Sequence, residues 1–340
     1  MDLDTAIRQM PKSEMHLHFE GAFRWSTVRE LHPDGRGMPA TPPWTGRPFA
    51  GWDGFTQVFR DFLKPVTGTP AWIERHAFEA LEDLALQNVR VVELLVSHRF
   101  HAWRGLSEQE VWEAVVRGRD RARAAYGIEA PLFLGVSRDQ LPADAERVFE
   151  TIAAFAHPAG WLRGIDLQSD ERARANREFT GLYAKAAALG LKLRAHAGEL
   201  GGPENVRDAV ELCGVRHISH GTRAAEDPQV VAGLARGGVW LHLCPSSNRL
   251  LGVSPSLASH PLRAFLSAGV RCTVNADDPL LFGTDTTSEF RLLATRMGFA
   301  PAEIAALAKN GFLASLLPPA EIDRACREID AAFAGIPSPP

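Results

Sequence analysis

At 340 residues, with 45% hydrophobic and 23% charged residues, the chain has the composition of an ordinary soluble globular protein. Its formal net charge of -4 argues against a nucleic-acid-binding surface, and no apolar run approaches the roughly 18–20 residues needed to cross a membrane. The four cysteines form no C-x-x-C pair and the N-terminus lacks a signal-peptide apolar core, so we expect a reduced, cytoplasmic protein whose oligomeric state the sequence leaves open.

The first predicted element is a strand within residues 14–21, where hydrophobic and polar side chains alternate with a period of two. His16 and His18 fall on the same face of this strand, so both imidazoles can reach one metal ion. The alternative is a pair of surface histidines on an edge strand. The other candidate ligands in the chain decide between these two interpretations.

The segment after this strand has an irregular composition. A short helix is expected over Ser26–Leu31, whereas the run His32–Trp52 is so rich in proline and glycine that regular structure is not expected there. Long irregular segments inside a compact protein are usually functional lids or disordered linkers. Aromatic residues then recur at helical spacing over Phe55–Leu63, which predicts a helix that packs on the core, covers a pocket as an aromatic lid, or does both.

From there, strands and helices alternate along the chain. Strands are predicted over Val89–Val96, Pro131–Val136, Trp161–Leu167, Leu191–Ala197, His217–Gly221, Val239–Cys244 and Arg271–Ala276. Helices are predicted over Ala71–Gln87, Ser107–Tyr126, Ala143–Ala156, Glu171–Leu189, Glu204–Cys213, Asp227–Ala235 and His260–Ala268. With the first strand, this gives eight strand–helix units and favours a closed (β/α)₈ TIM barrel of the α/β class over an open sheet. Extra C-terminal helices are expected over Ser288–Met297, Pro301–Leu316 and Pro319–Ala334, the terminal Pro-Ser-Pro-Pro is expected to fray, and residues 1–340 are treated as a single domain.

Polar side chains gather at the ends of the predicted strands, which is where the chemistry of such a barrel is located. These groups are His16 to Glu20, Asp166 to Ser169, His196 to Glu199, His217 to His220 and Asn275 to Asp278. Imidazole nitrogen and carboxylate oxygen are suitable zinc donors. We therefore predict that His16, His18, His196 and Asp277 bind one Zn²⁺ ion per chain.

Three further residues are candidates for the chemistry around this ion. Glu199 can act as an acid and base near the metal, although it can also be a carboxylate at the start of a helix near Pro203. His220 can hold the attacking water, or it can have a structural role in which it orients a metal ligand by hydrogen bonding. Asp278 can fix a polar substrate or cap a helix next to the ligand Asp277.

Six ordered motifs extend this pattern over nearly the whole chain, from Pro11 to about Ser315. They are Pro11-Lys-x-Glu14-x-His16-x-His18-x-Glu-Gly21, Gly164-Ile-Asp-Leu, His196-Ala-Gly-Glu199, His220-Gly221, Cys244-Pro-x-Ser-Asn248 and Asn275-x-Asp277-Asp278-Pro279. Together they resemble the adenosine deaminase family, a branch of the metal-dependent amidohydrolase-like barrels. The H-x-E and P-C-x-x-C pattern of the other zinc deaminases is absent.

The resemblance implies a (β/α)₈ barrel that removes the 6-amino group of a purine nucleoside by hydrolysis, as in the conversion of adenosine to inosine. It implies that Glu199 passes a proton to purine N1 and that His220 orients the zinc hydroxide. Asp278 is expected to contact N7 and the backbone N–H of Ser169 to contact N3. The substrate, a small purine nucleoside or base, is thus expected to lie against His18, Glu20, Ser169 and Asp278.

Two positions depart from the pattern of adenosine-specific members. Glu20 stands where these commonly have an aspartate facing the ribose, and Leu167-Gln168-Ser169 stands where they usually read Leu-Ala-Gly. The alternatives are therefore an adenine deaminase or an aminodeoxyfutalosine deaminase. A hydrolase acting on another cyclic C–N bond, or a purine-binding protein without activity, is a more distant alternative.

Overall fold

The structure is a computed structural model that describes residues 2–337, so most of the terminal Pro-Ser-Pro-Pro expected to fray lies outside the described residues. Eight parallel strands form one sheet in sequence order, which confirms the predicted (β/α)₈ barrel. The strands are β1 (Lys12–His18), β2 (Val89–Val96), β3 (Leu132–Ser137), β4 (Leu162–Gln168), β5 (Lys192–Ala197), β6 (His217–His220), β7 (Trp240–Leu243) and β8 (Arg271–Val274). These strands are almost entirely buried because helices cover their outer side, as expected of parallel sheets.

The barrel closes where β8 runs on into the segment beside β1. The backbone N–H of His18 donates to the carbonyl of Asp277 at 3.0 Å, and the N–H of Asp277 donates to the carbonyl of His16 at 3.1 Å. Leu17 and Asp277 thereby form an isolated parallel bridge. Barrel closure therefore places Asp277 directly beside the two histidines of the first strand.

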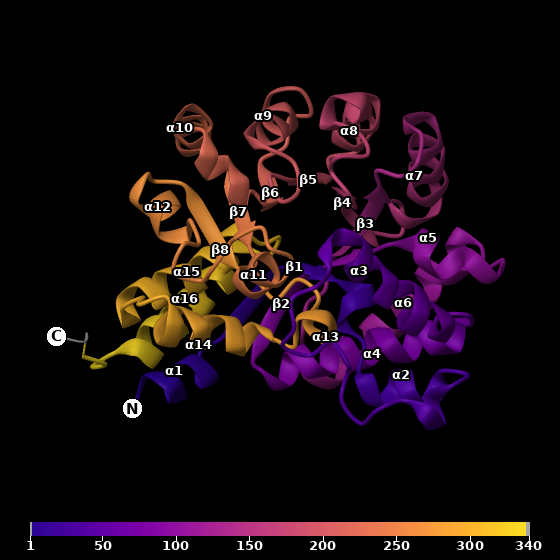
Figure 1. Cartoon of the computed structure of the whole chain (residues 1–340), viewed down its shortest axis with the longest axis horizontal. Coiled ribbons are helices and arrows are strands. Elements are labelled where there is room, and N and C mark those ends of the chain that lie inside the picture. The colour runs from indigo at the N-terminus through magenta and orange to yellow at the C-terminus, as the bar shows by residue number, and fades with distance from the viewer. Residues whose placement is uncertain (1, 338–340) are drawn as a thin grey trace.

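Helices surround the barrel, and both described ends of the chain lie on the same side of it, where α1 contacts α14 and α16 (Figure 1). The longer helices are α4 (Pro70–Leu86), α6 (Glu108–Tyr126), α7 (Pro142–Ala156), α8 (Thr180–Ala188), α9 (Pro203–Glu211), α10 (Pro228–Gly237), α14 (Thr286–Arg296), α15 (Pro301–Ala314) and α16 (Pro319–Phe333). The shorter ones are α1 (Leu3–Gln9), α2 (Trp25–Leu31), α5 (His98–His101), α11 (Pro245–Leu250), α12 (Leu262–Ser267) and α13 (Pro279–Phe282). No helix within residues 2–337 combines the length and the apolar character needed to cross a bilayer.

Local sequence signals account for many helix ends. In α6, Ser107 and Glu110 form a reciprocal capping box that satisfies backbone N–H groups at the start of the helix. The prediction missed α1, although Asp2 caps it by accepting from the N–H of Thr5. A helix of only seven residues shows little periodicity, which explains why the pattern did not reveal it.

The predicted helix Glu171–Leu189 is wrong over its first half. Residues 171–175 form a turn, a 3₁₀ helix follows at Asn176–Phe179, and the α-helix α8 begins only at Thr180. The reason is tertiary, because Glu171 accepts hydrogen bonds from the loop after β5 and Arg138 donates to the carbonyl of Arg174. These contacts hold the segment as a loop despite its helix-favouring composition.

The region between β1 and α4 covers the carboxyl ends of the strands. Between α2 and α3 (Gly51–Val58), residues 32–50 contain only one 3₁₀ turn, Gly35–Gly37, so the irregular segment expected over His32–Trp52 is confirmed except for its last two residues, which begin α3. The helix α3 runs on into a π-helical turn, Phe59–Leu63. Both interpretations of the aromatic helix hold, since Phe55 and Leu63 pack into the core while Phe55 and Phe59 also line a cavity.

Candidate active site

A cavity of about 240 Å³ lies at the carboxyl ends of the barrel strands, under α3 and its π-helical turn. All predicted site residues except His16 line it, namely His18, Glu20, Ser169, His196, Glu199, His220, Asp277 and Asp278. His16 is fully buried next to His18. The remaining wall is formed by Trp52, Phe55, Thr56, Phe59, Arg60, Ser97, Phe100, Gln168 and Leu251.

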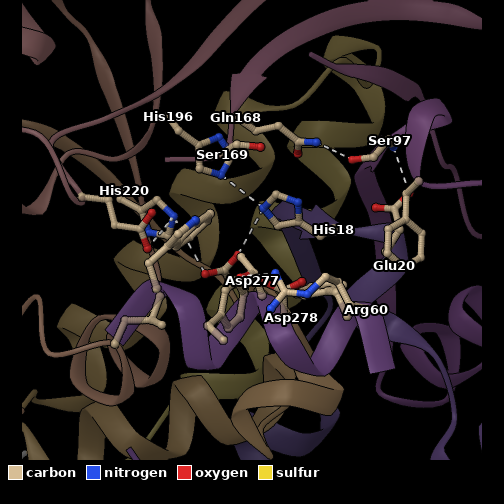
Figure 2. A pocket seen from close by; sticks show the side chains of 17 residues that line it. His18, Glu20, Arg60, Ser97, Gln168, Ser169, His196, His220, Asp277 and Asp278 are labelled. Carbon is tan, nitrogen blue, oxygen red and sulfur yellow. Dashed lines mark hydrogen bonds and ion pairs between the residues drawn. The ribbon is translucent and has the colours of Figure 1, made fainter. Parts of the chain in front are cut away.

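Three histidine nitrogens and one carboxylate oxygen, from His16, His18, His196 and Asp277, converge at the bottom of this cavity, and Figure 2 shows the side chains of His18, His196 and Asp277. The Nε2 atom of His18 lies 3.3 Å from that of His16 and 3.1 Å from that of His196. The Oδ1 atom of Asp277 lies 3.2 Å from His16 Nε2 and 3.4 Å from His18 Nε2. Donors at the corners of a tetrahedron, each about 2.0–2.1 Å from a zinc ion, are about 3.3 Å apart. These four spacings are close to that value and fit side chains that share one metal ion.

The protonation of the histidines supports the same conclusion. Asp166 accepts a hydrogen bond from Nδ1 of His196 at 2.9 Å, so the Nε2 atom of His196 carries a lone pair. Burial lowers the pKa of His16 and His18, the latter to about 3, so both rings are neutral at physiological pH. Neutral imidazoles are the form that binds a metal ion.

Asp277 supplies the negative charge of this cluster. Burial alone would raise the pKa of its carboxyl group, but His16 and His220 beside it lower the pKa well below the usual value. Asp277 is therefore ionised.

Glu199 and His220 lie together beside the four donors. His220 Nε2 lies 3.5 Å from Glu199 Oε1 and 3.8 Å from Asp277 Oδ2. Burial, followed by the neighbouring charge of Asp277, raises the pKa of Glu199 well above its ordinary range, which favours the protonated form of this carboxyl group. A protonated carboxyl group in a closed site is a suitable proton donor.

Asn248 fixes the tautomer of His220. Its Oδ1 accepts hydrogen bonds from Thr222 at 2.8 Å and from His260 at 3.0 Å, which sets the orientation of the amide. The Nδ2 group then donates to Nδ1 of His220 at 3.3 Å. Because burial lowers the pKa of His220 well below its usual value, the ring is neutral and its single proton lies on Nε2, facing the donors.

Glu171 holds the loop that carries Glu199. Its carboxylate accepts hydrogen bonds from the backbone N–H groups of Gly198, Glu199 and Leu200 at 2.8, 2.7 and 3.0 Å, and from the side chain of Asn205. The turn after β5 is thus fixed by a buried carboxylate from the turn after β4. The sequence identified Glu171 only as the first residue of a predicted helix and gave no sign of this role.

The side chain of Asp278 occupies a space beside Gly21 that a side chain at residue 21 would fill. A Cβ atom added at Gly21 would lie 1.9 Å from Oδ1 of Asp278. Burial and the charge of Asp277 raise the pKa of Asp278 well above its usual value, and its Oδ1 has no hydrogen-bond partner within residues 2–337. An unpartnered, protonated carboxyl group at a cavity wall is suited to bind a polar substrate atom.

Backbone strain is concentrated at this site. Within residues 2–337, four residues other than glycine have positive φ angles, and three of them are Ser169 (76°), His220 (64°) and Asp277 (64°). Each follows or ends a barrel strand. Such conformations are costly for residues with a side chain and persist where the surrounding structure enforces them, often at functional sites.

The comparisons with known proteins agree with this fold and site. The model of the adenosine deaminase family matches residues 11–332. An adenine deaminase from Sphingopyxis alaskensis is 34% identical over 337 residues, which cover 96% of this chain and 95% of that protein. An aminodeoxyfutalosine deaminase from Streptomyces avermitilis is 32% identical, with 97% and 93% coverage.

Two solved structures are similar over nearly their full length. The crystal structure of adenine deaminase from Arthrobacter aurescens has a TM-score of 0.86 at 27% identity and covers 95% of this chain and 98% of that one. An amidohydrolase from Burkholderia ambifaria with bound zinc has a TM-score of 0.83 at 26% identity, with 97% and 93% coverage. The fold and site define a metal-dependent hydrolase of the amidohydrolase-like barrels. The chain belongs to the adenosine deaminase family and is a hydrolase that acts on carbon–nitrogen bonds of cyclic amidines.

Proposed function

We propose that this chain deaminates free adenine, so that adenine and water give hypoxanthine and ammonia. The observation that carries the proposal is the convergence of four metal-type donors, the carboxyl group of Glu199 and the imidazole of His220 in one small cavity. Hydrolysis of a ring amidine needs these components, namely a nucleophile from water, a proton donor for the ring and an oriented hydrogen-bond partner. Because the cavity takes residues from His18 through to Asp278, we also propose that the chain acts as one catalytic domain.

The proposed metal is one zinc ion, held by His16, His18, His196 and Asp277. When bound, zinc makes a water-derived nucleophile available at neutral pH because it lowers the pKa of water from 15.7 to about 7. His220 orients this water through its Nε2–H group. Glu199 gives its proton to ring nitrogen N1 and then transfers a proton from the added water to the departing amine, so that ammonia leaves as the C6–N bond breaks.

The ring is oriented by two further contacts in this proposal. Asp278 donates to N7, and the backbone N–H of Ser169, held at a φ of 76°, donates to N3. The side chain of Ser169 is engaged elsewhere, 3.0 Å from the hydroxyl of Ser137, which leaves the backbone group as the contact. The purine is then fixed on three edges while C6 faces the metal-type donors.

Free adenine fits the cavity better than adenosine, the substrate that the resemblance placed first. Pockets that bury drug-sized ligands are typically about 300–1,000 Å³, and this cavity, at about 240 Å³, lies below that range. Relatives named adenine deaminases also align over almost the whole chain. These observations favour the free base over its nucleosides.

Aminodeoxyfutalosine is the second candidate substrate, favoured by the mouth of the cavity. Phe59, Phe100 and Arg60 lie there, and an aromatic and cationic rim can hold a larger group attached to the purine. The relative from Streptomyces avermitilis that carries this name supports the same possibility.

A substrate panel tests the proposal. The zinc-loaded protein is mixed with adenine, adenosine, 2′-deoxyadenosine and aminodeoxyfutalosine, and ammonia release is followed together with the ultraviolet change from 6-amino to 6-oxo purine. We expect adenine to have the highest kcat/KM. A preference for aminodeoxyfutalosine would support the second candidate, and the absence of turnover with all four compounds would refute the proposed 6-aminopurine reaction.

A variant tests the role of Glu199. Glu199→Gln preserves the size of the side chain but cannot transfer a proton, so we expect kcat to fall by about 10²–10⁴-fold while zinc content stays at one per chain. Metal content by atomic emission and turnover of adenine are the two measurements. Turnover close to that of the unchanged protein would remove Glu199 from the mechanism.

A further inference from the structure

One wall of the cavity is a belt of polar groups that comes from the ends of three strands. Glu20 follows β1, Ser97 follows β2 and Gln168 ends β4. The N–H of Ser97 donates to Oε1 of Glu20 at 2.9 Å, and the side-chain amide of Gln168 donates to the hydroxyl of Ser97. Figure 2 shows Ser97 and Glu20 on the opposite side of the cavity from His220. The three side chains thus form one connected wall.

The carboxamide of Gln168 is clamped in this wall. On one side the Nε2–H group of Gln168 donates a hydrogen bond to the hydroxyl of Ser97. On the other side the carboxamide packs against Gly135 of β3, which has no side chain in that space. A Cβ atom at residue 135 would lie 2.8 Å from Nε2 and 3.0 Å from the amide carbon of Gln168. The side chain is nearly fully buried, so it cannot swing into solvent to admit a bulky ligand. The Gln168 side chain is therefore a fixed part of the cavity wall.

Two acceptors in this wall lack a partner. Oε1 of Gln168 is buried without a hydrogen bond within residues 2–337. Oε1 of Glu20 is oriented by Nε2 of His101 at 2.9 Å, but its second oxygen has no hydrogen-bond partner in the same part of the chain, and Glu20 lines the cavity. Buried acceptors without donors are unfavourable. Of these two acceptors, Glu20 is the one that can accept from an N–H group of a ligand in the cavity, because it lines the cavity.

The placement of the ring decides which atom meets this wall. In a purine, N9 is separated from N3 by one carbon atom and lies across the ring system from C6. When C6 faces the metal-type donors and N3 faces Ser169, N9 points to the neighbouring Gln168, Ser97 and Glu20. A free base presents an N–H donor there, whereas a nucleoside presents a sugar carbon and no donor.

We propose that Gln168, clamped between Gly135 and Ser97, restricts the substrate to free 6-aminopurine bases by occupying the space of an N9 substituent, while Glu20 accepts the N9–H group. This inference rests on the function proposed above and deepens it. A site built around a substrate N–H discriminates strongly against analogues that lack it, because its own polar groups are then left unpaired.

The test compares Gln168→Ala with Gln168→Leu. Alanine opens the wall, whereas leucine keeps most of the bulk without the amide. The readout is the ratio of kcat/KM for adenine to that for 9-methyladenine and for adenosine. We expect the unchanged protein to prefer adenine by about 100-fold, Gln168→Ala to reduce this ratio at least about tenfold through faster turnover of the N9-substituted compounds, and Gln168→Leu to keep most of the preference.

Binding provides a readout that does not need turnover. In the zinc-loaded Glu199→Gln protein, calorimetry should show tighter binding of adenine than of 9-methyladenine, and Gln168→Ala added to it should bring the two affinities together. An unchanged ratio in folded Gln168→Ala protein would overturn the inference, as would an original preference for 9-methyladenine. If no 6-aminopurine is turned over but the preference for binding adenine over 9-methyladenine depends on Gln168, the proposed reaction is refuted. The inference that Gln168 sets the binding specificity is then still supported.

Discussion

The substitution Asp166→Asn would test the buried network beneath the metal-type donors. Asp166 is fully buried and accepts three hydrogen bonds, from His196 Nδ1 at 2.9 Å, from Arg194 Nε at 2.5 Å and from Ser219 Oγ at 2.7 Å. Although burial opposes ionisation, His196 and Arg194 hold the pKa of Asp166 well below its usual value, so it is a carboxylate. In their present protonation states, His196 Nδ1–H and Arg194 Nε–H can only be satisfied by an acceptor, whereas the hydroxyl of Ser219 can donate or accept.

An asparagine at residue 166 would supply an NH₂ group in place of one carboxylate oxygen. If this group faces His196, then Nδ1 must become the acceptor and the proton must move to Nε2, which removes the lone pair needed for a metal ion. Loss of such supporting contacts typically reduces metal affinity about 10–100-fold, and the forced change of tautomer places our expectation at about 100-fold. The charge of Arg194 also loses the nearer of its two carboxylate partners, since Asp166 lies 2.5 Å away and Glu93 lies 3.5 Å away.

The expected loss of stability follows from the same contacts. Removing one member of a buried ion pair typically costs about 3–5 kcal/mol. Arg194 keeps Glu93 at 3.5 Å, so we expect about 3 kcal/mol, at the lower end of that range. Urea unfolding of the metal-free protein measures this term separately from zinc affinity, which is measured by competition with a chelator.

The matched control is Asp144→Asn, which removes a carboxylate from an exposed pair with Arg147 and should change stability by less than about 1 kcal/mol. A zinc affinity within threefold of the unchanged protein in Asp166→Asn would refute the tautomer argument. Stability within about 1 kcal/mol of the unchanged protein would refute the claim that Asp166 is the main counterion of Arg194.

Two further predictions concern packing and pH. Gly21→Ala places a methyl group 1.9 Å from Asp278 Oδ1. We therefore expect the free energy of unfolding in urea to fall by about 1–3 kcal/mol and the KM for the substrate to increase. An unchanged KM would contradict the placement of Asp278 in the cavity. Burial lowers the pKa of His260 from 6.5 to about 4, so between these pH values the unfolded chain binds a proton that the folded chain does not. The contribution of neutral His260 to the free energy of unfolding is complete above pH 6.5 and decreases as the pH falls, by roughly 3 kcal/mol at pH 4. The free energy of unfolding of His260→Asn should therefore decline less steeply on the acid side.

The sequence itself was sufficient for the order of the strands and for placing the predicted site residues at one end of the barrel. The run Val89–Val96 is predicted and observed with identical bounds because six of its eight residues are valine or leucine, as expected of a buried parallel strand. His16 and His18 share a strand face, so the alternation of residues already indicated that they converge. Glu199, His220 and Asp278 follow strands, and strand ends meet at one edge of any (β/α)₈ barrel.

What only the tertiary structure decided depends on contacts between distant residues. The helix predicted from Glu171 begins only at Thr180, because the Glu171 carboxylate accepts from N–H groups 27 to 29 residues further along the chain. Gln168 meets Ser97 across 71 residues, so no local pattern could identify the wall that they build. Asp277 reaches the histidines of β1 only because the last strand closes on the first. Local propensity determines where a strand or helix can form, whereas long-range hydrogen bonds and barrel closure decide which side chains meet.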